Sequence, residues 1–433
     1  MISRTTISRR DALRALSVGF CGWSTTHWMP ALVSAASAAP AKPKSVILLW
    51  LNGGPATIDL WDLKPGHANG GPFQEISTRV AGMKISEHLP KLSQAASDFS
   101  IIRSMSTREG DHSRARFVSL TGYTPQGAIQ FPAVGSLVAH EFDDASRDIP
   151  SYVHIGGRPR IVNGGFLGPK FAPFVVEGGG RRGAPGPAPA NLKVADLAPS
   201  EDVSQRQQAT RLALAGELRG LSAVSGGSQV VDALDSANDR ALRLMRPEAA
   251  AAFDLEQESK TLRESYGPGS FGQGCLMARR LVERGVSFVE VVLDGWDTHN
   301  NNFERVKELS QQLDSGFSAL LADLKQRGLL EQTLVVCQGE FGRTPKINGQ
   351  SGRDHWPSSW AAVMAGAGVR GGQVIGGTSK DGTAVESKPT RTCDLMATVF
   401  KSVGLDPMKQ NMSNVSRPIR LADPEAKPIE ELL

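Results

Sequence analysis

Residues 333–357, TLVVCQGEFGRTPKINGQSGRDHWP, decide the fold that we predict for this chain. The stretch begins with the apolar run Leu334–Cys337, which is typical of a buried strand. Glu340 follows between two glycines, which allow a sharp turn and the close approach of a ligand. A second polar cluster closes the stretch and has neither a helical nor a strand period. Because open α/β sheets bind ligands beyond the carboxyl ends of their strands, Glu340, Asp354 and His355 are candidate site residues.

The residues before this stretch predict a second strand end close to it. Val286–Leu293 is a β-rich run that leads into a polar loop. Phe303–Gln326 has apolar residues at three-to-four spacing, which is typical of an amphipathic helix. A strand, a helix and a strand in sequence predict a parallel pair with a right-handed crossover, so that both loops open at the same edge of the sheet. We therefore expect these residues of the first loop to lie near Glu340: Asp294, Asp297 and His299.

Two junctions nearer the N-terminus supply further candidates. The continuous apolar run Val46–Leu51 predicts a central strand covered on both faces, and it ends at Asn52. Asn52 is a candidate oxygen ligand, and an Asx-turn is an equally good interpretation. A helical pattern after a polar loop places His112 and Ser113 near a helix N-terminus, which binds anions, and Arg116 one turn further would reinforce this. A capped surface helix is the alternative.

Composition excludes several classes of protein. At 433 residues, with 40% hydrophobic and 21% charged residues, the chain has the composition of a soluble globular protein of one or two domains. The net charge of +4 is small, and no basic stripe with interleaved aromatic residues is present, so we predict no nucleic-acid partner. The cysteines outside the leader, Cys275, Cys337 and Cys393, form no CxxC pair, and neither a zinc knuckle nor a disulfide framework is indicated.

Residues 1–38 predict a twin-arginine signal peptide and therefore export by the twin-arginine pathway, to the periplasm or elsewhere outside the cytoplasm. Arg9 and Arg10 are followed by the weakly apolar segment Ala15–Ala36, and Ala36–Ala38 has the small-x-small pattern of a cleavage site. The apolar segment contains several polar residues, which argues against a stable membrane span after processing.

The rest of the chain, residues 39–433, is predicted to be a single domain. A glycine- and proline-rich flexible loop is expected over 176–200, and charge-rich helical patterns predict a helical insertion over 203–267. The acidic segment after Leu421 is expected to fray. The sequence does not indicate an oligomeric state.

Acidic and imidazole side chains gathered at strand ends are ligands for divalent metals. Carboxylates suit hard cations such as calcium, and histidine adds a preference for zinc, manganese or iron. Two metals about 4 Å apart would clamp the attacking and leaving oxygens of a phosphoryl or sulfuryl transfer. The predicted metal ligands are Asn52, Asp294, Asp297, His299, Glu340, Asp354 and His355. The predicted catalytic residues are His112, Ser113 and Arg116.

Several motifs along the chain resemble a family of exported proteins known as domain of unknown function 1501. These motifs are SRRDALR, WLNGGPATIDLWD, ISEHLPKL, TGYTP, GWDTH, GEFGRTP and GRDHWP. That family is similar to a branch of the alkaline phosphatase and sulfatase superfamily. The resemblance covers essentially the whole chain, and it implies an α/β three-layer sandwich with a mostly parallel central sheet, a helical insertion and a metal site at the strand ends.

The resemblance also implies how many metal ions are bound. Asn52 stands where sulfatases carry an aspartate, and GEFG resembles the Asp-His-Gly loop of the superfamily with Phe341 in place of the histidine. Because these two positions depart from the superfamily pattern, one divalent ion is favoured over two. The ligands that the resemblance implies for this ion are Asp297, His299, Glu340 and His355.

The helix SRARFVSLTG resembles the sulfatase helix that carries the nucleophile and an arginine. Arg116 falls on the arginine position and His112 on the nucleophile position, where sulfatases have a modifiable cysteine or serine and phosphatases have a serine or threonine. Three alternatives follow: Ser113 is a displaced nucleophile, His112 forms a phospho-histidine, or His112 acts as a base toward water.

Two hypotheses for function follow from these observations. The first is an exported metal-dependent hydrolase of phosphate or sulfate esters, which acts on a small anionic ester or on a sulfated or phosphorylated polymer. The second is an exported pseudoenzyme that keeps the fold without turnover and serves as a binding or assembly protein.

Overall fold

The computed structural model describes residues 45–144, 146–157, 164–178 and 246–433, together with isolated positions between 192 and 244. The predicted signal peptide, most of the predicted flexible loop and the first part of the predicted helical insertion lie outside these residues. Pro43–Leu433 forms one compact unit. None of the helices in the described part of the chain has the length and apolar character that a membrane span requires.

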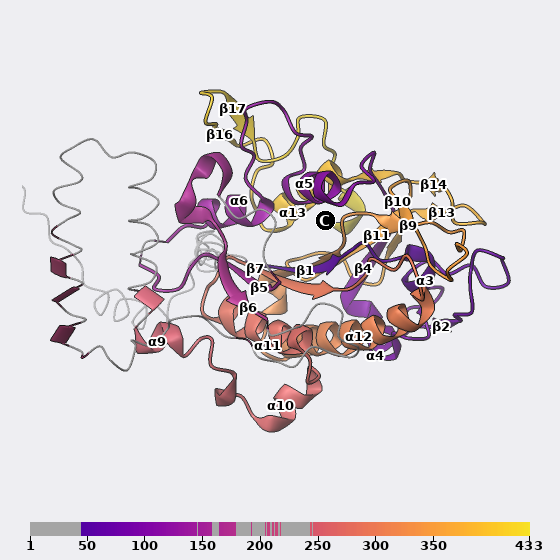
Figure 1. Cartoon of the computed structure of the whole chain (residues 1–433), viewed down its shortest axis with the longest axis horizontal. Coiled ribbons are helices and arrows are strands. Elements are labelled where there is room, and N and C mark those ends of the chain that lie inside the picture. Colours follow the sequence, from indigo (N-terminus) through magenta and orange to yellow (C-terminus); the bar gives the residue numbers. More distant parts are fainter. Residues whose placement is uncertain are drawn as a thin grey trace, which may run out of the picture. The chain divides into compact units, whose positions relative to one another are not determined.

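The centre of the described fold is a sheet of nine strands (Figure 1). These are β1 (Ser45–Asn52), β4 (Phe99–Ser106), β5 (Tyr152–Gly156), β6 (Phe174–Glu177), β7 (Phe288–Asp294), β8 (Thr333–Gln338), β11 (Trp360–Ala365), β12 (Val374–Ile375) and β15 (Thr390–Arg391). Their order is β12-β4-β11-β8-β1-β7-β5-β6, with β15 beside β4. Only β11 is antiparallel to its neighbours within this sheet, so the sheet is mostly parallel.

Four two-stranded ribbons lie outside the main sheet in the described residues. They are formed by β2 (Glu75–Ser77) with β3 (Lys84–Ser86), β9 (Gly342–Arg343) with β10 (His355–Trp356), β13 (Gly377–Thr378) with β14 (Val385–Ser387), and β16 (Gln410–Met412) with β17 (Pro418–Arg420). The β9–β10 ribbon matters for function because it folds the second polar cluster back onto the loop after β8.

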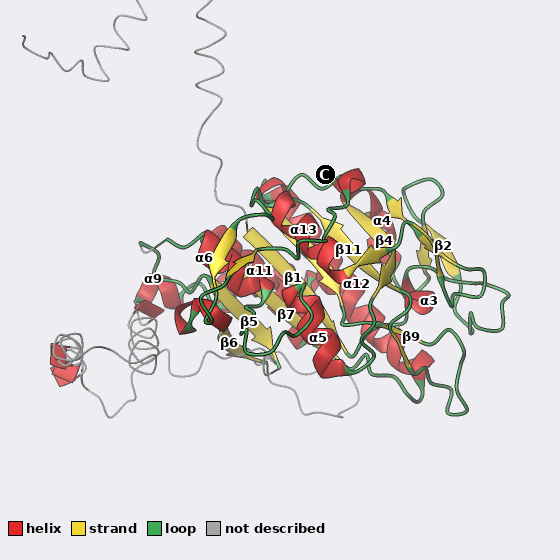
Figure 2. Cartoon of the chain, turned by 90° about the horizontal axis from the view of Figure 1, so that it is seen from above, coloured by secondary structure: helices red, strands yellow, loops and turns green. Residues whose placement is uncertain are grey.

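Helices cover both faces of the sheet and make three layers (Figures 1 and 2). One face carries α4 (Pro90–Gln94), α11 (Ser270–Glu283) and α12 (Asn302–Gln326), and the other carries α5 (His112–Thr121), α6 (Val134–Glu141) and α13 (Thr392–Ser402). Shorter helices are α3 (Thr57–Leu60), α9 (Pro247–Ala250) and α10 (Lys260–Ser265).

Strand β1 shows why the sheet is covered on both sides. Ile47, Leu49 and Leu51 enter the apolar core beneath α11 and α12, whereas Val46, Leu48 and Trp50 enter the core beneath α6 and α13. Successive side chains of a strand point to opposite faces, so a continuous apolar run has to be buried on both. The predicted α/β class, with a mostly parallel central sheet between helical layers, is confirmed.

The predicted strand–helix–strand unit exists, with one correction. The strands β7 and β8 are parallel, and α12 lies between them in the sequence. The two strands are not adjacent in the sheet, because β1 lies between them and pairs with both. The apolar residues on both faces of β1 suit this central position. The three strands end at the same edge, where Asn52 lies opposite Asp294 in the register.

The expectation that the C-terminal segment frays is wrong. Leu432 is fully buried in the apolar core next to α13. The N–H of Ile429 donates a hydrogen bond of 2.9 Å to Thr398 Oγ1 on the same helix. The few apolar residues of this acidic segment therefore anchor it to the domain.

Candidate functional site

The site lies where the ends of β1, β7 and β8 meet the N-terminus of α5. Gly53 follows β1 with a φ of 116°, and a Cβ atom at this position would lie 2.3 Å from the backbone nitrogen of Asp297. Only glycine accommodates both this backbone conformation and this contact. The GlyGly turn after β1 thus allows the loop after β7 to pass directly over it.

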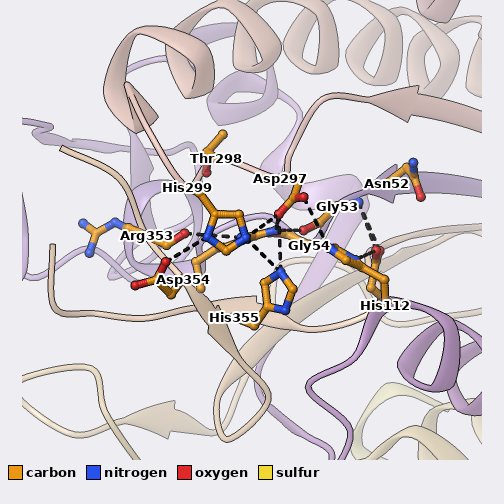
Figure 3. Close-up of polar contacts among 12 residues, drawn as sticks. Asn52, Gly53, Gly54, His112, Asp297, Thr298, His299, Arg353, Asp354 and His355 are labelled. Carbon is orange, nitrogen blue, oxygen red and sulfur yellow. Dashed lines mark hydrogen bonds and ion pairs between the residues drawn. The ribbon is translucent and has the colours of Figure 1, made fainter. Parts of the chain in front are cut away.

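Three histidine rings converge on one carboxylate at this edge (Figure 3). Asp297 Oδ1 lies 3.1 Å from His299 Nε2 and 3.4 Å from His355 Nε2. Asp297 Oδ2 lies 3.4 Å from His112 Nε2. We call these four residues the His/Asp cluster. The Nε2 atoms of His299 and His355 lie only 3.1 Å apart, so the rings present the same nitrogen to a common centre.

The other nitrogen of each ring lies against an oxygen. The Nδ1 partners are Glu340 Oε1 for His112 at 2.7 Å, Asp354 Oδ1 for His299 at 2.8 Å and the carbonyl oxygen of Gly110 for His355 at 2.8 Å. A carbonyl or an ionised carboxylate only accepts hydrogen bonds, so each Nδ1 carries a proton and Nε2 is the nitrogen that each ring presents to the centre. Histidines that bind metals are held in this way by their second nitrogen.

Glu340 is fully buried and does not face the centre of the cluster. Both of its carboxylate oxygens accept from the backbone N–H of Gly53, at 3.1 and 3.2 Å. Its Oε1 also accepts from His112 and, at 3.3 Å, from Arg116 Nη2. Glu340 therefore orients the ring of His112.

Arg343 is fully buried and contacts the carboxylate of Asp297 and, at 3.4 Å, Nε2 of His299. Its Nη2 lies 2.5 Å from Asp297 Oδ1, and its Nε donates a hydrogen bond of 2.9 Å to the carbonyl oxygen of Gly54. Burial lowers the pKa of Arg343, although the charge of Asp297 opposes this shift. For Asp297, burial raises the pKa, but hydrogen bonds from His112 and His355 and the charge of Arg343 outweigh it and hold the pKa well below its usual range.

His112 carries an extra proton when no metal is bound. Hydrogen bonds to Asp297 and Glu340 raise its pKa to about 9, although burial opposes the shift. The ring then has protons on both nitrogens at neutral pH. A cation that binds at Nε2 has to displace one of them.

Several predicted residues take other positions. Asn52 Nδ2 donates to Asp294 Oδ1, and both side chains lie beside the cluster rather than in it. The exposed Asp354 contacts His299 Nδ1 and not the centre. Ser113 is exposed on the first turn of α5.

The predicted anion site at the N-terminus of α5 is occupied by the chain itself. Asp111 Oδ1 accepts from the N–H groups of Ser113 and Arg114, each at 3.1 Å, which makes it the N-cap of the helix. His112 and Arg116 point toward Glu340 instead of toward an anion at this helix end. The alternative that the sequence left open, a capped helix, describes this end.

Sequence reasoning missed two buried arginines. Arg343 holds Asp297 as described, and Arg353 makes a bidentate ion pair with Asp59, at 2.9 and 2.8 Å, in which both side chains are fully buried. This pair ties the loop before β10 to α3. Both arginines stand within polar motifs of the sequence, GRTP and GRDHWP, but nothing in the sequence distinguishes a buried arginine from an exposed one there.

The fold and the site define a mixed α/β protein with a His/Asp cluster at the carboxyl edge of a mostly parallel sheet. A family described as "Protein of unknown function (DUF1501)" matches residues 43–433, and the chain belongs to this family. The family resemblance predicted from the motifs is thereby confirmed.

Three of the solved structures that are similar to this chain are named here. They are the PsFucS1 sulfatase from Pseudoalteromonas sp. (14% identity, TM-score 0.40, covering 87% of this chain and 70% of that one), a protein in the alkaline phosphatase superfamily from Vibrio parahaemolyticus (10%, 0.40, 84% and 67%) and the phosphonate monoester hydrolase SpPMH from Silicibacter pomeroyi (12%, 0.36, 90% and 76%). No curated protein matches the chain. Because the identities and TM-scores are low, the activities of these proteins are not transferred to this chain.

Proposed function

We propose that the chain binds one divalent metal ion through the His/Asp cluster and uses it to hydrolyse phosphate or sulfate esters. One observation carries the proposal. The Nε2 atoms of His112, His299 and His355 face the carboxylate of Asp297, while the Nδ1 of each ring is held by an oxygen. Metal-binding histidines are fixed in this way by their second nitrogen, with the other nitrogen turned toward the metal.

The donor set fits a metal of intermediate softness. Three imidazoles and one carboxylate suit zinc, manganese or iron better than calcium or magnesium, which prefer oxygen ligands. His112 Nε2 is buried and faces Asp297 Oδ2 at 3.4 Å. The lone pairs of His299 Nε2 and His355 Nε2 repel each other across 3.1 Å unless a cation or a proton lies between them.

A divalent ion held here would act as a Lewis acid toward an ester oxygen and would lower the pKa of a water molecule. Arg343 keeps Asp297 ionised and in position, and Glu340 fixes the ring of His112. The centroid of the buried Phe341 ring lies 4.9 Å from that of His112 and 4.6 Å from that of His355, which makes this side of the cluster apolar.

The contacts of His112 favour water over a protein side chain as the nucleophile. Nδ1 of His112 is bound to Glu340, and its Nε2 belongs to the donor set, so neither nitrogen is available to attack an ester. Ser113 points away from the ring of His112 by its position on the helix, since successive residues of a helix are about 100° apart. The twin-arginine pattern of residues 1–38 supports a periplasmic site of action.

The proposal is tested on the purified mature protein, with metal content measured by mass spectrometry. We expect about one zinc, manganese or iron ion per chain and metal-dependent turnover of phosphate or sulfate esters that stops with a chelator and returns with metal. Asp297→Asn should lose the metal ion and the turnover. Asp406→Asn, at an exposed position outside the cluster, should keep the metal ion and the turnover. A folded protein that takes up no metal from any of the three would contradict the proposal.

A non-catalytic binding protein is the second candidate. The engagement of both nitrogens of His112 favours it, because the position that the family resemblance assigns to the nucleophile cannot attack a substrate. A stoichiometric metal ion without turnover across a broad panel of anionic esters would support this candidate over the hydrolase.

A further inference from the structure

A guanidinium lies where the oxygens of two strand ends converge. Arg116 Nη2 donates to Asn52 Oδ1, at the end of β1, and to Glu340 Oε1, after β8, at 3.3 Å. Asn52 Nδ2 in turn donates to Asp294 at the end of β7. Arg116 is only 6% exposed and Glu340 is fully buried, so this contact belongs to the interior of the site.

The surroundings of this guanidinium are those of a cation site. A fully buried carboxylate is costly unless a positive charge lies beside it. Glu340 supplies a carboxylate oxygen, and Asn52 supplies a carbonyl oxygen, at the same nitrogen of Arg116. Oxygens of this kind are what hard divalent cations take as ligands, whereas the neighbouring His/Asp cluster is rich in imidazole.

We propose that the guanidinium of Arg116 stands in for a second cation, fills the oxygen-lined place between Asn52 and Glu340, and limits the site to one metal ion. This rests on the proposed function, since it assumes that the His/Asp cluster binds the first ion. An arginine keeps its charge at every physiological pH and does not dissociate as an ion does. The chain thereby obtains the structural effect of a second cation without depending on its supply.

Glu340 links the two places. Its Oε1 contacts both Arg116 Nη2 and His112 Nδ1, so the charge of Arg116 acts on the carboxylate that orients a ligand of the first ion. Arg116 is therefore a positioning residue. Removal of the Arg116 side chain should open a place for a small cation next to the first ion. The small cation would enter this place past the half-buried Asn52 and the exposed Asp294.

The test compares metal stoichiometry in the wild type and in Arg116→Ala by mass spectrometry after equilibration with zinc and calcium together. We expect one zinc ion per chain in the wild type, and one zinc plus one calcium ion in Arg116→Ala. Guanidinium ion at low millimolar concentration should compete with the calcium and raise the thermal stability of Arg116→Ala. Arg114→Ala is the matched control on the same helix, because that side chain is exposed and pairs with Glu109; it should bind one ion only.

The outcomes separate the two proposals. A wild type that binds two ions, or an Arg116→Ala protein that stays at one ion and does not respond to guanidinium, overturns the role of Arg116 and leaves the metal-dependent function intact. A wild type that binds no zinc here, and no manganese or iron when these are offered instead, overturns the proposed function. If Arg116→Ala does not fold, Arg116→Gln keeps a hydrogen-bond donor without the charge, and it should bind the second ion as well.

Discussion

Metal binding should strengthen about 50-fold when the pH rises from 7 to 9, because a proton and the metal compete for Nε2 of His112. Hydrogen bonds to Asp297 and Glu340 raise the pKa of His112 to about 9. Two pH units below that pKa, only about one molecule in 100 has Nε2 free, and the apparent affinity is reduced by the same factor. Binding at pH 7 should therefore release about one proton per ion.

Isothermal titration calorimetry of the metal-free protein measures the metal affinity and the number of protons released on binding. Titrations at pH 7 in two buffers with different ionisation enthalpies give the number of protons released, and a pH series gives the slope of affinity against pH. In His112→Gln the affinity should be lower but nearly independent of pH between 7 and 9. His140→Gln, on α6 outside the cluster, should behave as the wild type. An affinity that does not change with pH in the wild type, or an equal slope in His112→Gln, would refute this reasoning.

Three further predictions concern stability and the residues around the cluster. The raised pKa of His112 stabilises the metal-free protein by at most about 3 kcal/mol. This contribution is fully present below pH 6.5, the pKa of His112 in the unfolded chain, and is lost as the pH rises through about 9. Urea unfolding of the wild type and of His112→Gln below pH 6.5 and above pH 9 measures it. Asp354→Ala should weaken metal affinity about 10- to 100-fold, because His299 loses the partner of its Nδ1, and calorimetry that shows an unchanged affinity would contradict this. Arg353→Met should destabilise the fold by about 3–5 kcal/mol in urea unfolding, because the carboxylate of Asp59 is left buried without its ion pair; Asp59→Leu in the same chain should recover part of the loss.

The fold followed from the sequence where apolar patterns decide it. The runs at Val46–Leu51 and Leu334–Cys337 and the helical spacing over Phe303–Gln326 correspond to β1, β8 and α12. The position of β1 between β7 and β8 could not be predicted, because pairing of distant strands depends on the packing of whole layers rather than on local spacing. The C-terminal segment was mispredicted because its acidic composition hides a few apolar residues that are buried against α13.

The site was predictable as a location but not as a set of roles. Strand order alone brings Asp297, His299 and Glu340 to one edge of the sheet. Which carboxylate reaches the centre is decided by the GlyGly turn after β1, which turns Glu340 toward the backbone of Gly53, and by the β9–β10 ribbon, which turns Asp354 toward the outer nitrogen of His299. These are side-chain directions fixed by tertiary contacts, and no spacing in the sequence encodes them.

The charge balance of the cluster gives a physical reason to expect an anionic substrate. The carboxylates of Asp297 and Glu340 are each paired with a buried guanidinium, that of Arg343 at 2.5 Å and that of Arg116 at 3.3 Å. Exchange of the proton on His112 for a divalent ion then raises the charge of this nearly balanced group by one unit. In a partly buried site such a charge attracts a phosphate or sulfate ester and stabilises the further negative charge that develops on its oxygens during hydrolysis. A neutral ester would gain much less binding energy from the added positive charge, so the same exchange that loads the metal ion also favours an anionic substrate.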